Sequence, residues 1–339
     1  MSGEVVVVGG GVAGLTTAVV LAESGWSVRV WSREPAERTC SAVAGALWWP
    51  YRVEPEELVG DWSLDSLRVY EELARTPEDT GVRLVAGVMA GTTPAGLGAW
   101  GAGVAGLTDG SDGLRAVLPL IDMPAHLRYL RRRLEAAGGV VEQRGVTRLA
   151  EAAPSPGHAV VNCTGMGARE LVPDGGVRPV RGQLVVVENP GVEEWYVGAT
   201  GGADSVYLFP QPYGLVLGGT AQEDQWGQEP DPAVARAIVE RCARVRPEVA
   251  GAKMLEHRVG LRPARDGGVR LEAERLSSGG LCVHNYGHGG AGVTVAWGCA
   301  REAARLVGAV RGGGPGWARG GGAGGGAAPG RLLGYRTFG

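Results

Sequence analysis

A short glycine-rich run near the amino terminus has the spacing of a phosphate-binding turn. Gly9, Gly11 and Gly14 follow the pattern G-x-G-x-x-G, with Val12 and Ala13 before the last glycine. Such glycines let the backbone approach a pyrophosphate, and the amino terminus of the helix that follows offers free N–H groups to it. In a chain with 60 glycines the turn alone is a weak signal, so its context decides.

An acidic residue stands where a dinucleotide-binding unit needs one. Glu34 comes twenty residues after Gly14, at the end of a second apolar run, Ser27–Trp31. We expect its carboxylate to bind the ribose hydroxyls of an adenosine, and Arg33 beside it to contact phosphate or the adenine edge. This context predicts a βαβ dinucleotide-binding unit, but the motif does not separate NAD from FAD.

Arg262 is the side chain best suited to anchor a small acid. A guanidinium group matches a carboxylate through two parallel hydrogen bonds, which fix orientation as well as affinity. The alternative is a structural salt bridge on a sheet, a role open to every arginine of the chain. From the residue type alone both roles stay open.

Neither the histidines nor the cysteines are spaced as metal ligands. His284 and His288 lie four residues apart, a spacing that joins two ligands only on a helix, and their stretch is too rich in glycine to form one. The five cysteines contain no C-x-x-C pair, so neither a zinc site nor a disulfide framework is expected. We expect no metal ion and assign both histidines to hydrogen bonds that stabilise a loop.

The elements around these residues change character along the chain. The first part alternates strands and helices: Glu4–Val8, a helix to about Ser24, Ser27–Trp31, helix Pro124–Ala137, Val140–Gln143 and Ala159–Cys163. Between about 180 and 262, short β-rich runs indicate an antiparallel sheet, interrupted by a helix from Pro232 to about Val245. A last helix, Arg301–Val310, precedes a tail rich in glycine and alanine.

Length and composition allow two packed domains and exclude several functions. The 339 residues carry a formal net charge of −3, which gives no electrostatic reason to expect nucleic acid. No apolar run approaches the length of a membrane span, and no basic leader precedes the first apolar run, so we expect neither a membrane anchor nor a secretory signal. The cytoplasm is the expected location, and the sequence leaves the oligomeric state open.

Beyond the glycine turn, a series of segments resembles D-amino-acid oxidases, in the same order along the first 311 residues. The most specific segment runs from His284 to Thr294 and is followed by Trp297 and Gly298. The others are Val43–Tyr51, Asn162–Gly165, Arg181–Gln183, Gly218–Thr220 with Trp226, and Gly260–Pro263 with Val269–Glu272. The resemblance implies an α/β fold in which a Rossmann-type FAD-binding domain is interleaved with an antiparallel-sheet substrate-binding domain.

This interleaving sets the expected domain boundaries. The FAD-binding domain takes residues 1–50, 125–178 and 280–311, and the substrate-binding domain takes 51–124 and 179–279. The glycine-rich carboxy-terminal tail, 312–339, is given no function.

The same resemblance implies a non-covalently bound FAD and the residues around it. Besides the glycine turn, Arg33 and Glu34, the matching positions are Thr39, Cys40, Ser41, Gly45, Ala46, Leu47, Val146, Thr164, Gly289, Gly292, Val293 and Thr294. Cys40 departs from the hydroxyl-rich pattern of the family, which leaves a side-chain hydrogen bond there open. A helix expected near Val293 would add its amino terminus to a second set of backbone donors for the flavin.

The resemblance also assigns the substrate site. Arg262 matches the carboxylate anchor, Tyr207 gives the same carboxylate a second hydrogen bond, and the carbonyl of Gly290 accepts one from the substrate amine. A further family tyrosine corresponds to Ala203, which implies a different or absent lid and a larger pocket. Trp49 is expected in the wall around the substrate side chain.

The implied activity is oxidative deamination of a D-amino acid. Hydride passes from Cα to flavin N5, the imine hydrolyses to a 2-oxo acid and ammonia, and molecular oxygen takes the electrons to form hydrogen peroxide. Trp195–Phe209 contains no Arg, Lys or His, which argues against a dicarboxylate and favours neutral and apolar substrates. The alternatives are a glycine/sarcosine or D-aspartate oxidase, a quinone-linked dehydrogenase, and a non-catalytic dinucleotide sensor.

Overall fold

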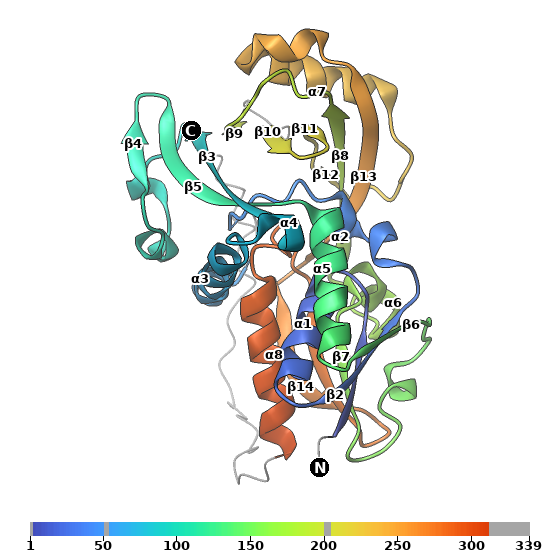
Figure 1. The fold of residues 1–339 in the computed structure, drawn as a ribbon. Coiled ribbons are helices and arrows are strands. Elements are labelled where there is room, and N and C mark those ends of the chain that lie inside the picture. Colours follow the sequence, from blue (N-terminus) through green and yellow to red (C-terminus); the bar gives the residue numbers. More distant parts are fainter. Residues whose placement is uncertain (1–2, 51–53, 200–204, 312–339) are drawn as a thin grey trace, which may run out of the picture.

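A computed structural model of the chain describes residues 3–50, 54–199 and 205–311, and it arranges them around two sheets (Figure 1). Ala203 and the tail 312–339 lie outside the described residues. The architecture is the mixed α/β fold expected from the sequence, with a largely parallel sheet and a largely antiparallel one.

The first sheet has six strands and carries the amino-terminal βαβ unit. Its order is β14 (Arg270–Arg275), β15 (Leu281–Tyr286), β7 (Ala159–Asn162), β1 (Glu4–Val8), β2 (Ser27–Ser32) and β6 (Val140–Gln143). All neighbours are parallel except β14 and β15. β1 lies centrally and its four valines are buried, as the apolar run predicts.

The second sheet has nine strands, and most of its neighbours are antiparallel. Its strands are β3 (Val82–Ala90), β4 (Thr108–Gly110), β5 (Gly113–Ile121), β8 (Val177–Val187), β9 (Trp195–Ala199), β10 (Ser205–Gln211), β11 (Gly214–Gly218), β12 (Gln222–Glu223) and β13 (Met254–Arg265). The long strand β8 pairs with β13 on one side and with β11 and β12 on the other. β3 and β9 are parallel.

Helices cover both sheets. They are α1 (Val12–Glu23), α2 (Cys40–Val43), α3 (Glu56–Leu73), α4 (Pro77–Thr80), α5 (Met123–Ala136), α6 (Ala168–Leu171), α7 (Pro232–Val245) and α8 (Ala296–Arg311). Six short 3-10 turns are η1 (Ala36–Arg38), η2 (Pro94–Gly96), η3 (Ala99–Gly103), η4 (Leu149–Glu151), η5 (Gly165–Gly167) and η6 (Pro247–Gly251). α1, α5 and α8 pack together against the six-stranded sheet, and α7 covers the outer face of β8, β10 and β11 (Figure 1).

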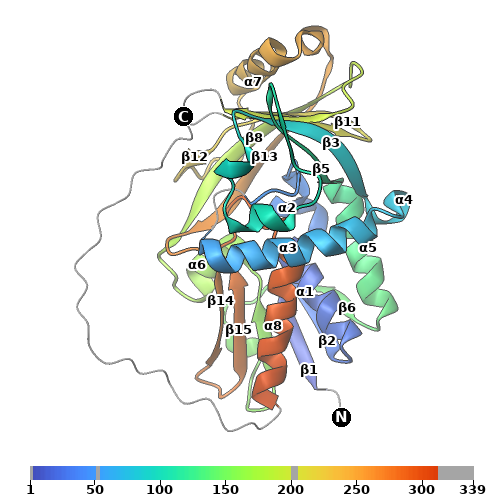
Figure 2. The same ribbon diagram turned by 90° about the vertical axis from the view of Figure 1, so that its left-hand side faces the viewer.

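The chain crosses between the two sheets several times. α3 follows the first βαβ unit, lies across the junction of the two sheets in Figure 2, and packs against α8. β14 lies within the range 179–279 that we expected in the substrate domain, yet it pairs with β15 in the six-stranded sheet along its whole length. The chain therefore enters the six-stranded sheet at β14, ten residues before the boundary expected at residue 280.

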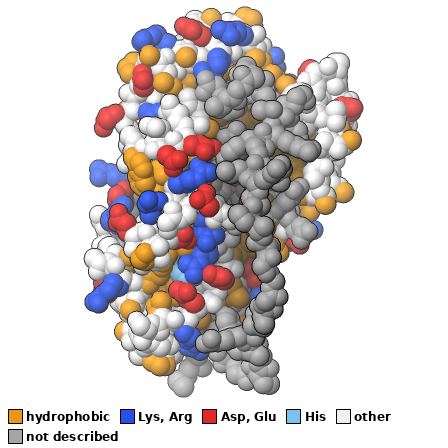
Figure 3. Space-filling model, turned by 180° about the vertical axis from the view of Figure 1, so that it is seen from behind, with side chains coloured by type: hydrophobic (Ala, Val, Ile, Leu, Met, Phe, Trp, Pro, Cys, Tyr) orange, Lys and Arg blue, Asp and Glu red, His pale blue; other side chains and the backbone are white. Residues whose placement is uncertain are grey.

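The surface and the core agree with a mixed α/β protein. One continuous apolar cluster extends from β1 and α1 through Trp48 to β3 and β5. On the face shown in Figure 3, acidic and basic side chains are interspersed along the described part of the chain. Among the helices of residues 3–50, 54–199 and 205–311, none is long and apolar enough to cross a membrane.

Candidate active site

The glycine turn between β1 and α1 is packed so closely that side chains are excluded. Gly9 has a φ of 120°, and a Cβ there would lie 2.3 Å from the carbonyl oxygen of Cys163. A Cβ on Gly14 would lie 1.9 Å from the carbonyl oxygen of Gly9. Gly11, the N-cap residue of α1, gives the helix no side-chain cap. This bare backbone at a helix amino terminus fits the pyrophosphate of a dinucleotide.

Residues 39–41 lie beside this turn. The hydroxyl of Ser41 accepts a hydrogen bond of 3.0 Å from the backbone N–H of Val12, and Thr39 lies next to it. Cys40 faces the other way, because its sulfur lies 3.4 Å from the position of a Cβ on Gly260 in β13. Burial raises the pKa of the Cys40 thiol, and the charge of Arg262 opposes that shift. The thiol is therefore near the strand of Arg262.

The expected adenosine-binding residues meet at the carboxyl ends of β2 and β6. Arg33 and Glu34 follow β2, lie within 3.6 Å of each other, and are 79% and 47% exposed, so both remain accessible to a ligand. Val146 follows β6 and packs against the apolar cluster that includes Trp31. Ser32 donates to the carbonyl oxygen of Glu34 and shapes the turn between the strand and these charges.

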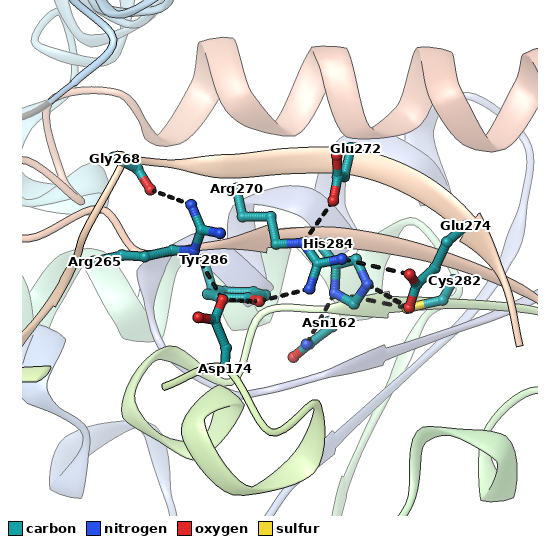
Figure 4. A network of polar contacts seen from close by, with 10 residues as sticks. All are labelled: Asn162, Asp174, Arg265, Gly268, Arg270, Glu272, Glu274, Cys282, His284 and Tyr286. Carbon is teal, nitrogen blue, oxygen red and sulfur yellow. Dashed lines mark hydrogen bonds and ion pairs between the residues drawn. The ribbon is translucent and has the colours of Figure 1, made fainter. Parts of the chain in front are cut away.

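Thr164, at the end of β7, begins a chain of directed hydrogen bonds that Figure 4 shows in part. Its N–H and hydroxyl both donate to Oδ1 of Asn162, at 3.2 and 2.7 Å. The amide nitrogen of Asn162 must then face Nδ1 of His284, at 3.2 Å, which accepts. Nε2 of His284 carries the ring proton and donates it to Glu274, at 2.9 Å. The sequence alone did not reveal Asn162 as the centre of this chain.

The same hydrogen bonds engage both ring nitrogens of His284. Donor atoms of Glu274, Cys282 and His284 lie within 4.8 Å of one another, across β14 and β15. A metal ligand needs a free lone pair on the ring nitrogen, but Nε2 holds the proton shared with Glu274. Burial lowers the pKa of His284, so the ring is neutral. His288 bonds to Asn285 instead, and burial lowers its pKa to about 4.

His284 differs from the sequence-based expectation in its element. We expected a loop residue, but His284 lies in β15, where alternation places it on the same face as Cys282. Further along that face, Asp174 accepts from both Arg265 and Tyr286, at 2.8 and 2.7 Å (Figure 4). Burial raises the pKa of Asp174, but these hydrogen bonds outweigh it and hold the pKa below its usual value.

The loop after β15 contacts the strand that carries Arg262. The N–H of Gly289 donates to the carbonyl oxygen of Pro263, at 2.9 Å. Gly290 is exposed next to this contact, and Gly292 follows it. Gly287 and Gly289 have φ values of 84° and 54°, which glycine adopts without strain. The loop and Arg262 are thus brought to one edge of the nine-stranded sheet.

The helix expected near Val293 begins later than the sequence suggested. α8 starts at Ala296, and the N–H groups of Trp297 and Gly298 donate to the hydroxyl of Ser66, at 3.1 and 3.0 Å. The first turn of α8 is therefore capped by the hydroxyl of Ser66 on α3. The hydroxyl of Thr294 donates to the carbonyl oxygen of Trp49, at 2.9 Å, so this side chain is also engaged.

Residues 45–47 lie against the nine-stranded sheet. Ala46 has a φ of 62°, and its carbonyl oxygen accepts from the N–H of Ile121 at the end of β5. Leu47 forms a bridge with Leu120. A Cβ on Gly45 would lie 2.9 Å from the ring of Phe209, which explains the glycine there. The backbone of 45–47 is thus held by the nine-stranded sheet.

Arg262 and Tyr207 lie on the same face of that sheet. Arg262, on β13, is half-buried and donates from Nη1 to the carbonyl oxygen of Thr220, at 3.0 Å. Among the described residues it forms no ion pair. Tyr207, on β10, lies against Gly218 and Gly219, directly before Thr220, and stacks on the ring of Phe209 at 4.7 Å. The structure therefore brings the two expected anchor residues to one segment, 218–220.

Trp49 lies at the border of this region. Its ring makes an edge-to-face contact with Trp100, at 5.0 Å between centroids. Ala203, the second residue that we expected in the pocket, falls outside the described residues. The arrangement offers a half-buried cation, a phenol and a glycine-rich loop near a dinucleotide-binding turn, which suits binding of a small carboxylate beside a cofactor.

Comparisons with known proteins agree with this architecture. A family model described as FAD dependent oxidoreductase matches residues 4–306. A D-amino-acid oxidase of Streptomyces coelicolor is 64% identical over 314 residues, which cover 90% of this chain and 97% of that protein. A D-amino-acid oxidase of Rubrobacter xylanophilus is 49% identical, with 90% and 95% covered.

A solved structure supports the fold independently of close sequence identity. Glycine oxidase from Geobacillus kaustophilus superposes with a TM-score of 0.73 at 18% identity, covering 91% of this chain and 95% of that one. With the family match over most of the chain and two D-amino-acid oxidases at 64% and 49% identity, the chain belongs to the FAD-dependent oxidoreductases of the D-amino-acid oxidase family.

Proposed function

We propose that this protein oxidises neutral and apolar D-amino acids to 2-oxo acids, with release of ammonia and hydrogen peroxide. The observation that carries the proposal is the setting of Arg262. Its half-buried guanidinium has a neutral carbonyl as partner and no carboxylate among the described residues, next to Tyr207 and the 287–292 loop. A charge left without a counter-ion in this way favours binding of an anion.

In this proposal the chain's own groups orient the substrate. Arg262 and Tyr207 hold the carboxylate, and the carbonyl oxygen of Gly290 accepts a hydrogen bond from the amine. Three fixed points on a chiral carbon leave one direction for its hydrogen, so only one enantiomer presents that hydrogen to the cofactor. FAD, when bound, supplies the redox chemistry by accepting a hydride and passing two electrons to molecular oxygen. No acid–base pair is required of the protein.

We propose that FAD is held without a covalent bond by three groups of residues. The turn Gly9–Gly14 and residues 39–41 surround the pyrophosphate, Arg33, Glu34 and Val146 surround the adenosine, and Gly45, Ala46, Leu47, Thr164 and the segment 289–294 surround the flavin. The close packing of the turn and the exposed Glu34 support this assignment. Acid precipitation should release all of the flavin, as FAD. Flavin retained on the precipitate, or released as FMN, would refute it.

The preference for neutral substrates rests on charge. No Arg, Lys or His occurs in Trp195–Phe209, which borders the proposed anchor through Tyr207. A second carboxylate in the substrate would therefore lack a cation on this side. Ala203 in place of a family tyrosine is expected to leave room for a bulky side chain.

Further proposals concern partners, location and domains. We take molecular oxygen as the electron acceptor and the cytoplasm as the location; the five cysteines are free thiols, as is common in a reducing compartment. We assign residues 1–50, 125–178 and 280–311, together with β14, to the FAD domain, and residues 51–124 and 179–269 to the substrate domain.

A panel of amino acids tests the function. Purified protein is supplied with single D- and L-amino acids, and peroxide formation is followed. We expect D-valine and D-leucine to give far higher kcat/KM than D-aspartate or D-glutamate, and no peroxide with L-enantiomers. A higher kcat/KM for D-aspartate, or reduction of a quinone without peroxide, would overturn the proposal.

A further inference from the structure

The guanidinium of Arg262 lies directly on bare backbone. A Cβ on Gly182, in the neighbouring strand β8, would lie 2.4 Å from Nη1, 2.5 Å from Nη2 and 2.6 Å from Cζ of Arg262. The three nearest atoms to this position all belong to the guanidinium group. A side chain at Gly182 would therefore meet the guanidinium of Arg262 first.

Tyr207 rests on backbone in the same way. A Cβ on Gly218 would lie 1.9 Å from Cζ of Tyr207, and one on Gly219 would lie 2.6 Å from its hydroxyl oxygen. Glycines thus form the floor beneath both members of the expected carboxylate anchor. With any side chain at these positions, Arg262 and Tyr207 would be raised from the sheet.

Thr220, which follows Gly219, fixes the rotation of the Arg262 guanidinium. The carbonyl oxygen of Thr220 takes one N–H of Nη1, at 3.0 Å. Thr220 is itself held by Gln183, because its hydroxyl accepts from the N–H of Gln183 at 2.9 Å and its own N–H donates to the Gln183 carbonyl. The residue after Gly182 therefore sets the position of the carbonyl that orients Arg262.

The opposite face of β8 holds the segment that follows Thr220. Arg181 is 7% exposed, and among the described residues it has no acidic partner. Its N–H groups donate to the carbonyl oxygens of Gly227 and Glu229, at 2.8 and 2.7 Å, and to Gln222. The side chain of Gln183 exchanges hydrogen bonds with the backbone of Asp231. Arg181 and Gln183 thus fasten residues 222–231 to β8.

We propose that Gly182 is a positioning residue for substrate binding, because its bare backbone leaves room for the guanidinium of Arg262. The backbone of Gln183 holds Thr220, whose carbonyl fixes the rotation of that guanidinium, and Arg181 fastens the segment that follows Thr220. This gives the segment Arg181–Gln183 a role in substrate orientation. The inference rests on the proposed function, because it takes Arg262 as the carboxylate anchor.

Gly182→Ala tests this positioning role without changing any charge. The new methyl group must stand at van der Waals distance, so the guanidinium moves by about 1 Å, and a misplacement of that size can cost about 100-fold in rate. We expect kcat/KM for D-valine to fall by about that factor and the Kd for benzoate, followed by the flavin spectrum, to rise. FAD content and the melting temperature should match the wild type, because only the mobile end of a side chain is displaced.

Two controls separate this effect from others. Gly251→Ala adds a methyl group where no atom lies within 4 Å, and it should leave both measurements unchanged. In an Arg262→Ala background, Gly182→Ala should have no further effect, because the group that it displaces is gone. A further loss of kcat/KM in that background, or an unchanged kcat/KM in the single variant, would overturn the positioning role of Gly182 while leaving the proposed function intact. A wild type that neither binds benzoate nor oxidises D-amino acids would overturn both.

Discussion

At the scale of single residues, the environment of Arg262 differs from that of the arginines that pair with a carboxylate. Many surface arginines here pair with a carboxylate, as Arg133 does with Glu23. Arg262 instead meets a neutral carbonyl, Thr220. The sequence could single out Arg262 only through its family context, because the neighbouring strand β8, where Arg262 is paired with Val180, lies far earlier in the chain.

The first prediction is that Arg262→Ala loses catalysis and keeps the cofactor. Removal of one partner of a desolvated charge pair costs about 2–5 kcal/mol, so kcat/KM should fall about 30- to 4,000-fold. Flavin content and spectrum should stay near wild type, and benzoate should stop perturbing that spectrum. Arg262→Lys should restore activity only in part, because an ammonium cannot form the two parallel hydrogen bonds.

Loss of FAD from Arg262→Ala, or retention of most of its kcat/KM, would contradict the assignment. Arg258 and Arg265 lie on the same strand, but both already have acidic partners, Glu256 and Asp174.

A second residue-scale prediction concerns acid stability. His126 is buried on α5, its Nδ1–H donates to the carbonyl oxygen of Thr80, and burial lowers its pKa from 6.5 to about 4. Between about pH 6.5 and pH 4, His126 is protonated in the unfolded chain and neutral in the folded chain. The free energy of unfolding therefore falls as the pH drops through this range. The loss is about 1.4 kcal/mol per pH unit for this one group.

His126→Asn keeps a donor for Thr80 and removes the titration. Urea unfolding at pH 8 gives the baseline for each protein, and the slope between pH 6 and pH 4.5 should be shallower for the variant by about 1.4 kcal/mol per pH unit. Equal slopes for the two proteins would mean that His126 is not held neutral by the fold. His288, with its own pKa of about 4, should keep part of the slope in both.

At the scale of elements, local signals predicted some parts well and others poorly. The βαβ unit and α7 appear within one residue of the expected bounds, because their caps and apolar runs are local features. Two starts were expected for the last helix, one near Val293 and one at Arg301, and α8 begins between them, at Ala296. The serine that caps it, Ser66, comes from α3 and is far away in the sequence. No local pattern could supply that partner.

The pairing of strands likewise could not be predicted from the order of residues along the chain. Whether β14 belongs to one sheet or the other depends on β15, which follows it by a turn, and not on its own charged sequence. A search for metal-ligand spacing along the chain also finds only the pair His284 and His288. The two possible ligands that lie beside His284 are Glu274 and Cys282, and the pairing of β14 with β15 brings them there.

The glycine turn gives a prediction for the element that binds the cofactor. Gly14→Ala would place a methyl group 1.9 Å from the carbonyl oxygen of Gly9, and backbone must move to admit it. We expect a markedly weaker FAD complex and about 1–3 kcal/mol less stability. Gly308→Ala, a helical glycine with open space around its Cβ position, is the control and should stabilise the protein slightly. Full FAD content in Gly14→Ala would argue against this turn as the pyrophosphate site.

At the scale of the whole molecule, the two sheets are joined by α3 and α8. Gly298 on α8 touches α3 so closely that a Cβ would lie 2.4 Å from the backbone oxygen of Trp62. Ser66, one turn further along α3, caps the same helix end. Because α3 comes from between the first two of the three segments that we propose for the FAD domain, this contact couples the halves of the fold.

We therefore expect one cooperative unfolding transition and a strong effect of Gly298→Ala. The free energy of unfolding of the variant should be about 1–3 kcal/mol lower. The variant should also bind FAD less tightly, because α8 follows the 287–292 loop. Gly308→Ala on the same helix is again the matched control. Separate transitions for circular dichroism and flavin fluorescence in the wild type would show that the sheets unfold independently.

In the proposed reaction, a D-amino acid held by Arg262 beside FAD delivers a hydride to the flavin. Anaerobic mixing of the holoenzyme with D-valine or L-valine tests this step directly, through the visible absorbance of the flavin. We expect rapid and complete bleaching with D-valine and none with L-valine. At low substrate concentration, bleaching of Arg262→Ala by D-valine should be slowed by the same factor as kcat/KM. Equal reduction by both enantiomers, or reduction that does not depend on Arg262, would contradict it.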